Sequence, residues 1–179
     1  LAMALHKADI HILGTHPEMI DLAENRYSFF RLLDSIGLNQ PRWKRATDRK
    51  AAEEFCKEVG FPCLVRPSYV LSGAAMNVAF CIEDLMVYLD RAVAVSADNP
   101  VVLTRFITDA KEVEVDAVVR EGRVEVLAIS EHIENAGVHS GDATLVLPPQ
   151  DLTEVTQEKI RLATYAIAEA LEIDGPLNI

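Results

Sequence analysis

One stretch near the middle of the chain restricts the possible fold more than any other. Residues 112–119 alternate largely between acidic and apolar side chains, which is the pattern of a β-strand with one buried face. A second strand-like run, 123–130, follows, and Glu121 and Gly122 lie at the turn between the two. This arrangement predicts a long antiparallel hairpin, so the fold has to contain a sheet built around it.

The rest of the sequence mixes short strands with helices. Helices are predicted where apolar residues recur at helical spacing, and Gly37 and Gly60 suit their ends. Hairpins outnumber strand-helix-strand crossovers, which favours an α+β fold with largely antiparallel sheets. The expected strands are 9–13, 43–46, 62–68, 76–81 and 101–107, and the expected helices lie within 14–37 and at 49–60 and 82–96.

A last helix is expected to begin near Asp151, because the spacing from Asp151 to Glu154 suits a capping pair. Apolar residues then repeat at helical spacing, which predicts one buried face. The residues of that face are Ile160, Ala163, Ile167 and Leu171.

The balance of charges excludes one class of function. The chain has 17 Lys and Arg against 28 Asp and Glu, a net charge of −11, whereas sequence-independent nucleic-acid binding needs an excess of basic residues. No apolar run reaches the roughly 18 residues of a membrane span, and the N-terminus has no signal-peptide pattern. We therefore expect neither a nucleic-acid partner nor a membrane partner.

Cysteine usage and the two ends of the chain give further expectations. Cys56, Cys63 and Cys81 are odd in number and fit no CxxC spacing. This predicts reduced, mostly buried thiols of an intracellular protein and speaks against a zinc site. Both ends look cut, so we expect a segment of a longer polypeptide.

In the segment 64–76, "LVRPSYVLSGAAM", an arginine lies at the end of an apolar strand, and a run of small residues follows it. Small residues let backbone N–H groups approach a phosphate, and Arg66 would add a charge and a bidentate donor. The P-loop motif is absent, and as a bare pattern a tight hairpin explains this loop equally well.

Glu112, Glu114 and Asp116 share the polar face of the strand predicted at 112–119. A solvated face is the ordinary explanation of such a pattern. The functional alternative is that one carboxylate accepts hydrogen bonds from a ribose. Glu112 is placed best for that role, because it follows 104–107 closely enough for one segment to line a base and its sugar.

Residues 131–149 combine catalytic-looking side chains with glycines. His139, Ser140 and Asp142 look like a hydrolase triad, but immediate sequence neighbours seldom converge in space as a triad requires. His132 and His139 are seven residues apart, which matches no common metal-ligand spacing. A loop that binds an anion through its backbone amides and a hydroxyl fits better, because glycines flank the polar pair.

Three motifs, "RPSYVLSGAAM", "EVEVDAV" and "SEHIENAGVHSGDATLVLP", occur in this order and together resemble the large subunit of carbamoyl phosphate synthetase. The resemblance covers essentially the whole chain. "RPSYVL" with "AGVHSGD" looks like the second of the two ATP-grasp halves, which phosphorylates carbamate. "LSGAAMN" is most similar to the eukaryotic multifunctional enzymes of pyrimidine synthesis, since bacterial relatives have a glycine where Ser72 stands.

The resemblance implies an incomplete ATP-grasp fold of two α+β lobes with largely antiparallel sheets. Residues 1–25 would end the preceding region, 26–104 would form the helical segment and lid lobe, and 105–179 would form a truncated core lobe. The implied activity is an ATP-dependent, glutamine-hydrolysing ligase that phosphorylates carbamate to carbamoyl phosphate. The isolated segment would be inactive, because the family's magnesium ligands lie on strands after Ile179. A non-catalytic nucleotide-binding or structural lobe of a larger assembly is the alternative.

The resemblance also assigns roles to single residues, with Arg66 as the catalytic residue. The implied ATP-binding positions are Arg26 and Arg66 at the phosphates, Ser72 and Gly73 in a mobile phosphate loop, Arg105 and Ile107 at the adenine, Glu112 at the ribose, and Gly137, Val138, His139 and Ser140 in a loop lining the pocket. The implied ligands are ATP, carbamate and Mg²⁺, with K⁺ as a further candidate. The implied partners are a glutamine amidotransferase domain or subunit and the other ATP-grasp half, in the cytoplasm or alternatively in mitochondria.

Overall fold

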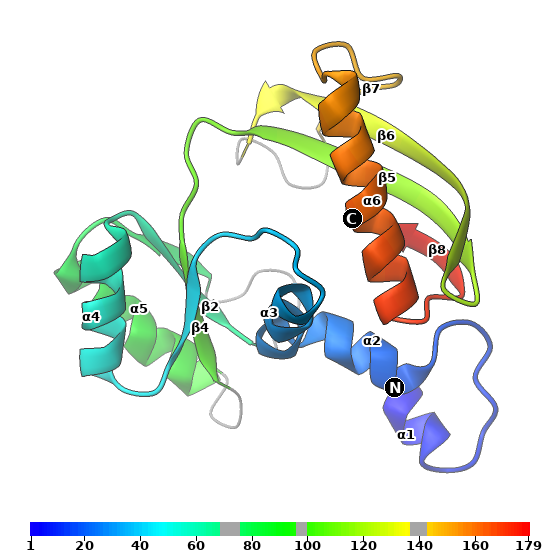
Figure 1. The fold of residues 1–179 in the computed structure, drawn as a ribbon. Coiled ribbons are helices and arrows are strands. Elements are labelled where there is room, and N and C mark those ends of the chain that lie inside the picture. Colours follow the sequence, from blue (N-terminus) through cyan, green and yellow to red (C-terminus); the bar gives the residue numbers. More distant parts are fainter. Residues whose placement is uncertain (69–75, 96–99, 137–142) are drawn as a thin grey trace. The chain divides into compact units, whose positions relative to one another are not determined.

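A computed structural model describes residues 1–68, 76–95, 100–136 and 143–179, and the chain divides into two compact units (Figure 1). The central unit is Leu22–Ile107. The split unit joins Leu1–Asp21 to Thr108–Ile179. Each unit contains its own four-stranded sheet.

The sheet of the central unit has the strand order β1-β4-β2-β3, and every neighbouring pair is antiparallel. Helices α4 and α5 contribute to one apolar core with this sheet. The elements are α3 (Arg26–Ser35), β1 (Trp43–Ala46), α4 (Arg49–Val59), β2 (Cys63–Pro67), β3 (Asn77–Ala79), α5 (Ile82–Val95) and β4 (Val101–Arg105).

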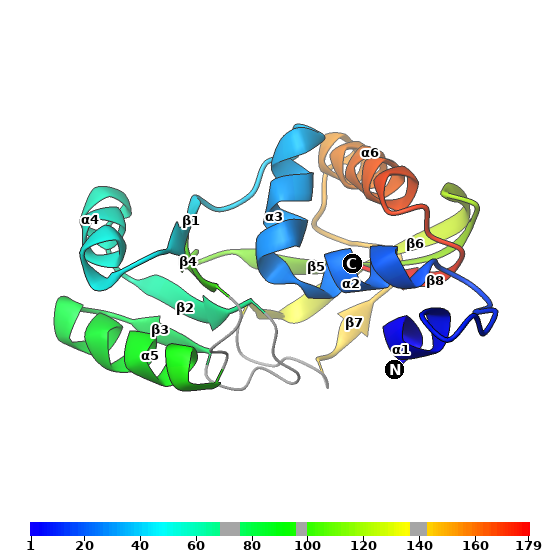
Figure 2. The same ribbon diagram turned by 90° about the horizontal axis from the view of Figure 1, so that it is seen from below.

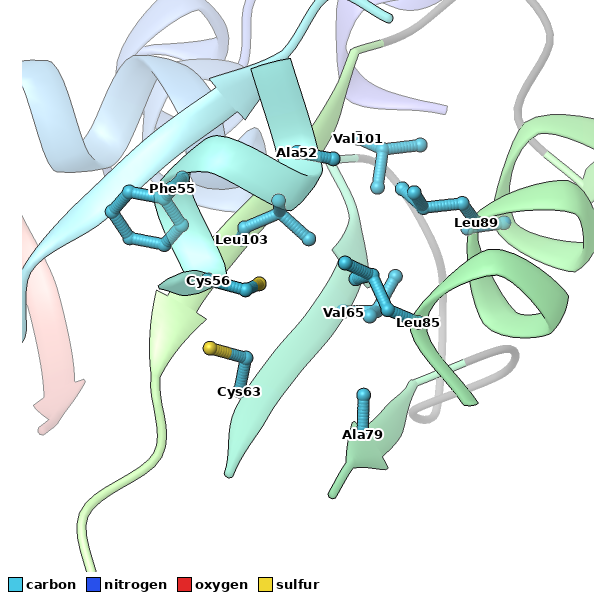
Figure 3. Packing of buried hydrophobic residues seen from close by; sticks show 11 residues of the cluster. Ala52, Phe55, Cys56, Cys63, Val65, Ala79, Leu85, Leu89, Val101 and Leu103 are labelled. Carbon is cyan, nitrogen blue, oxygen red and sulfur yellow. The ribbon is translucent and has the colours of Figure 1, made fainter. Parts of the chain in front are cut away.

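The core of the central unit lies between this sheet and its two helices (Figure 3). Val65 and Leu103 from the sheet are fully buried, as is Leu85 from α5. Each such aliphatic side chain stabilises the fold by about 1.5–3 kcal/mol relative to an exposed position. The thiols of Cys56 and Cys63 point toward each other in this core, are free, and have their pKa raised by burial.

The sheet of the split unit has the order β7-β6-β5-β8, again with antiparallel pairs. Helix α6 lies along one face of it (Figures 1 and 2), and α2 crosses the boundary between the units. The elements are α1 (Ala2–His6), α2 (Pro17–Glu24), β5 (Lys111–Arg120), β6 (Arg123–Asn135), β7 (Leu145–Val146), α6 (Glu154–Ala170) and β8 (Gly175–Asn178).

The long hairpin predicted from the sequence is confirmed as β5 and β6. Glu121 and Gly122 form its turn with φ of 48° and 75°, left-handed conformations that glycine adopts without strain. The Gly122 N–H donates to the carbonyl of Ile173 at 2.8 Å, and a Cβ at Gly122 would lie 3.3 Å from the Cα of Glu169. A larger residue there would therefore press the hairpin against the end of α6.

The strand predicted at 9–13 is wrong. These residues adopt no regular structure, and no described strand pairs with them. Asp9 has a φ of 56°, a turn conformation, and Leu13 is 86% exposed. Alternating side chains suit a strand, but the backbone forms one only where a neighbour completes the hydrogen-bond ladder.

Residues 14–37 contain two helices, α2 and α3, and Asn25 adopts an extended conformation between them. The predicted Asp151 cap of α6 is wrong: Thr153 is the N-cap, and its side chain accepts from the Thr156 N–H at 3.2 Å. Asp151 pairs instead with Lys111 at 3.0 Å.

Both units combine helices with an antiparallel sheet, which confirms the predicted α+β class. The buried face expected for α6 is also present, with Ile167 and Leu171 almost fully buried. In the part of the chain that the structure describes, no helix is both long and apolar enough to span a membrane.

Candidate functional site

Two arginines of the central unit come together where β2 ends and α3 begins. Arg66 is the fourth residue of β2. Arg26 is the first residue of α3, which Asn25 caps by accepting a hydrogen bond from the Ser28 N–H at 3.1 Å. The Arg26 N–H donates to the carbonyl of Ser68 at 3.0 Å, and this bond ties the start of α3 to the exit of β2.

One donor of the Arg66 guanidinium lacks an acceptor in the part of the chain that the structure describes. Its Nε atom is buried and has no hydrogen-bond partner among the described residues. Burial lowers the pKa of Arg66, and the positive charge of Arg26 lowers it further. Arg26 donates to the sulfur of Met76 at 3.9 Å, a weak acceptor. A bound anion would supply the missing acceptor and offset the repulsion between the two guanidiniums.

The exit of β2 is held rigidly beside these arginines. Ser68 is fully buried, and both its N–H and its hydroxyl donate to the carbonyl of Pro100, the N–H at 3.0 Å. Ser72 and Gly73, the predicted phosphate loop, follow in the chain and lie outside the described residues.

Arg105 and Ile107, predicted to contact the adenine, lie at the end of β4. The Arg105 N–H donates to the carbonyl of Arg42 at 2.9 Å, and the Phe106 N–H donates to the carbonyl of Pro62 at 3.1 Å. The side chains of Arg105 and Ile107 are exposed, and Ile107 is the last residue of the central unit. Their contact with a base stays a prediction.

Glu112 lies on β5 of the split unit, at an irregularity in the β5–β6 pairing. Lys111 is opposite Asn135, and Val113 is opposite Glu131, so two steps along β5 correspond to four steps along β6. Such a bulge bends the strand and redirects side chains away from strict alternation. Glu112, the predicted ribose-binding residue, thus lies at a bulge and not in the regular part of the hairpin.

His132 is a buried residue of the same bulge, and its two ring nitrogens face different carboxylates. Nε2 is hydrogen-bonded to Glu114 Oε1 at 3.0 Å, and Nδ1 lies 4.0 Å from Glu112 Oε2. The His132 side chain is 5% exposed, whereas the Glu112 side chain is 42% exposed. The carboxylate of Glu112 is therefore partly exposed to solvent, and the histidine beside it is buried.

A second buried carboxylate, Glu131, pins the bulge to the segment that precedes α6. One oxygen forms an ion pair with Lys111, and the other accepts from the N–H groups of Gln150 and Asp151, both at 3.0 Å. The hydrogen bond from Lys111 holds the pKa of Glu131 below its usual range, and the Asp151 N–H lowers it further. Glu131 is thus a structural anion that joins three segments of the split unit.

Several predicted residues cannot be placed against this geometry. Gly137, Val138, His139 and Ser140 lie outside the described residues, as do Ser72 and Gly73, so their roles stay predictions.

The sequence interpretation also missed three contributors. Glu114 was placed on the same strand face as Glu112 but was given no specific role. His132 was considered only as a metal ligand, and no role was predicted for Glu131. The sequence did show that Glu112 and Glu114 lie two residues apart and so on one face of a strand. Their contacts with His132 could not be predicted, because they depend on the bulge.

Two other features bear on a nucleotide site. A cavity of about 400 Å³ in the central unit is lined by Ala46, Leu89 and Val93, and the Arg49–Asp90 ion pair borders it. It includes none of the predicted ATP-binding residues. Within residues 1–68, 76–95, 100–136 and 143–179, no three His, Cys, Asp or Glu side chains are arranged to hold a metal. The expectation that the magnesium ligands lie after Ile179 stays a prediction.

Comparison with solved structures defines the fold. The chain matches the biotin carboxylase domain of the 2-oxoglutarate carboxylase from Hydrogenobacter thermophilus with a TM-score of 0.80, over 99% of this chain and 40% of that one. At 16% identity this likeness shows the fold alone. The fold is that of the ATP-grasp enzymes, which confirms the predicted architecture.

Sequence comparison then defines the family. Residues 25–179 match the family described as "Carbamoyl-phosphate synthase L chain, ATP binding domain", and the chain belongs to it. The whole chain is 57% identical to "Multifunctional protein CAD" of Squalus acanthias and 51% identical to "Carbamoyl-phosphate synthase [ammonia], mitochondrial" of Aquarana catesbeiana. It spans 8% and 12% of the lengths of these relatives. The family resemblance read from the sequence is confirmed.

Proposed function

We propose that this chain binds ATP for the phosphorylation of carbamate to carbamoyl phosphate within a larger synthetase. The observation that carries the proposal is the buried Nε of Arg66, which lacks a hydrogen-bond partner in the described part of the chain, beside the second positive charge of Arg26. In a chain of net charge −11, two adjacent guanidiniums at a strand end suit a strongly anionic ligand such as a triphosphate. The structural neighbour from H. thermophilus is described in complex with MgADP and bicarbonate, which supports this choice.

Arg66 and Arg26 act on the phosphates of ATP. Guanidinium groups donate charge-assisted, often bidentate hydrogen bonds to phosphate oxygens. In phosphoryl transfer the protein mainly positions the reactants and stabilises the charge that develops on the transferred group. Ser72 and Gly73 add backbone donors in the phosphate loop, as the family resemblance implies.

The proposed reaction is a direct displacement at phosphorus. A carbamate oxygen attacks the γ-phosphorus of ATP while the bond from that phosphorus to the β,γ-bridging oxygen breaks, which yields carbamoyl phosphate and ADP. Mg²⁺, when bound, neutralises charge on the phosphates. Exclusion of water is part of the function, because carbamate and carbamoyl phosphate decompose in bulk solvent.

Other residues hold the nucleoside. Glu112 accepts hydrogen bonds from the ribose hydroxyls, since an ionised carboxylate has two acceptor oxygens and no donor. Arg105 and Ile107 contact the adenine from the end of β4. The loop from Gly137 to Ser140 lines the pocket near the sugar and phosphates.

The surrounding protein supplies the remaining parts of the reaction. A glutamine amidotransferase domain or subunit releases ammonia, and the other ATP-grasp half makes the carbamate. As the family resemblance implies, the whole protein acts in pyrimidine synthesis in the cytoplasm. The relative from A. catesbeiana, whose name includes "mitochondrial", supports the alternative location. Mg²⁺ and K⁺ are the proposed ions.

The test uses Arg66→Ala in the full-length synthetase, with phosphorylation of carbamate as the readout. Loss of a charge-assisted phosphate contact should weaken transition-state stabilisation by about 2 kcal/mol or more, which is roughly a thirtyfold lower kcat/KM. The matched control is Arg49→Ala, which removes an exposed arginine of the same unit that pairs with Asp90. An Arg66 variant as active as the Arg49 variant would refute the assignment.

A further inference from the structure

We propose that Met76 is an oxidation site that controls nucleotide binding. A peroxide converts its thioether to a sulfoxide, and the sulfoxide then competes with the phosphates of ATP for Arg26. The proposal rests on the proposed function of Arg26 as a phosphate-binding residue. It assigns a role to the sulfur beside Arg26, which the phosphoryl-transfer chemistry does not use.

Met76 lies beside the arginine pair, Arg26 and Arg66. Strands β2 and β3 are antiparallel, and Val65 is opposite Asn77. One further step along the two segments leads to Arg66 and to Met76, at the point where the described β2–β3 pairing ends. The Met76 sulfur accepts a hydrogen bond from Nη2 of Arg26 at 3.9 Å. Met76 is therefore an uncharged neighbour of the arginine pair.

The thioether of Met76 does little to satisfy the two guanidiniums. A methionine sulfur is a weak hydrogen-bond acceptor, and among the described residues the buried Nε of Arg66 has no acceptor. Burial lowers the pKa of Arg66 and the charge of Arg26 lowers it further, so the two guanidiniums are close enough to repel each other. A strong acceptor at this place would stabilise them, and in the proposed function that acceptor is a phosphate oxygen.

Oxidation of Met76 would place such an acceptor inside the protein. Hydrogen peroxide transfers one oxygen atom to the sulfur while its O–O bond breaks, and the other oxygen leaves with both hydrogens as water. The sulfur is oxidised to a sulfoxide, whose oxygen is a much stronger acceptor than a thioether. The unmodified sulfur lies 3.9 Å from Nη2 of Arg26. An oxygen bonded to this sulfur and turned toward that nitrogen would therefore come within hydrogen-bond distance, about 2.7–3.2 Å.

A small oxidant can reach this sulfur. Met76 is partly exposed, and its neighbour Arg26 has to be open to ATP if it binds the phosphates. A thioether also needs no deprotonation before it reacts. The thiols of Cys56 and Cys63 differ in this respect, because burial raises their pKa and keeps them in the unreactive protonated form. Peroxide should therefore oxidise Met76 more readily than these two cysteines.

Met86 provides a matched control in the same unit. It lies in α5, is also partly exposed, and packs against the apolar core of the central unit. Leucine keeps an apolar side chain of similar size and removes the sulfur at either position. Met76→Leu should therefore abolish the response of nucleotide binding to peroxide, whereas Met86→Leu should keep it. Each variant is compared with its own untreated sample.

The experiment treats the full-length synthetase with hydrogen peroxide and measures the reverse of the proposed step, ATP formation from ADP and carbamoyl phosphate. Mass spectrometry of peptides reports the oxygen atom added at Met76. Oxidation should raise the KM for ADP about tenfold in the wild type and in Met86→Leu, and less than about twofold in Met76→Leu. Methionine sulfoxide reductase should restore the original KM, whereas dithiothreitol, which reverses only cysteine oxidation, should not.

Met76→Gln tests the proposal without an oxidant. The amide oxygen of glutamine is a strong acceptor at nearly the place of a sulfoxide oxygen, so this variant should raise the KM for ADP more than Met76→Leu does. If Met76→Gln does not fold, which thermal unfolding reports, the oxidised wild type decides alone. A wild type that is oxidised at Met76 and keeps its KM would overturn the proposal. The same holds if Met76 resists peroxide while Met86 is oxidised, if Met76→Leu responds like the wild type, or if dithiothreitol restores the KM.

Arg26→Ala separates failure of the proposed function from failure of this proposal. If Arg26→Ala leaves the KM for ADP unchanged, Arg26 does not bind the phosphates, and both claims fall. If Arg26→Ala raises the KM and oxidation of Met76 does not, only the proposal for Met76 is wrong. In the Arg26→Ala background, oxidation should add less than about twofold to the KM, because its effect passes through Arg26. Full additivity of the two changes would contradict that route.

Discussion

The central unit and the split unit each bring like charges together, but with different surroundings. The central unit has a pair of arginines, and the split unit has two glutamates with a histidine between them. Arg26 and Arg66 are like charges close together, and one buried donor of Arg66 has no acceptor within residues 1–68, 76–95, 100–136 and 143–179. Glu112 and Glu114, also like charges, are separated by a histidine whose nitrogens face one carboxylate each. Among the described residues the first group lacks an acceptor for one buried donor, whereas in the second group the buried histidine is hydrogen-bonded to Glu114.

This difference suggests a separate role for each group in the proposed nucleotide binding. An unsatisfied, desolvated guanidinium reduces the stability of the free protein and strengthens its attraction for an anion. A carboxylate held by internal contacts adds less attraction but loses less entropy when it binds. We infer that the arginines supply most of the affinity for the nucleotide, and that Glu112 supplies orientation.

The largest expected effect separates affinity from stability at the arginine pair. Arg66→Met keeps an unbranched apolar side chain but removes the charge, so ATP affinity should fall by about 2 kcal/mol. Thermal unfolding of the free protein should stay equal or improve, because the variant removes a desolvated charge and its repulsion from Arg26. Calorimetric titration with ATP and thermal unfolding of the full-length protein measure the two quantities. If the variant loses stability and keeps its ATP affinity, Arg66 has a structural role and does not bind the phosphates.

A smaller effect is expected from Glu131, as a dependence of stability on pH. Because its pKa is lowered in the folded state, its contribution to stability is present above about pH 4.3, the ordinary value for glutamate, and is lost as the pH falls through the lowered value. Glu131→Gln should therefore lower the thermal midpoint at neutral pH and flatten its decline in acid. Glu125→Gln, on an exposed residue of β6, is the control. Parallel pH curves for wild type and Glu131→Gln would show that Glu131 is not a structural anion.

Local pattern predicted much of the fold, and the failures have physical causes. The β5–β6 hairpin was predictable because its turn and its buried face are encoded within about twenty consecutive residues. The strand expected at 9–13 failed because strand formation depends on a neighbour that alternation cannot reveal. The cap of α6 was misplaced because Asp151 satisfies the same local rule as Thr153 and only its pairing with Lys111 distinguishes them.

The sequence proposed the residues of the candidate site but not their arrangement. Family motifs pointed to Arg66 and Glu112, but the missing acceptor at Arg66 Nε depends on what packs around a strand end. The contact of His132 with Glu112 arises from a bulge that shifts the register of two strands, and register is not a local property of either strand.

The most direct test of the central claim is a structure of the full-length synthetase with a non-hydrolysable ATP analogue. We predict a phosphate oxygen about 2.7–3.2 Å from Arg66 Nε, with the Arg26 guanidinium on the same phosphate chain. A complex in which the phosphates bind elsewhere, with Arg66 Nε still lacking an acceptor, would contradict the account.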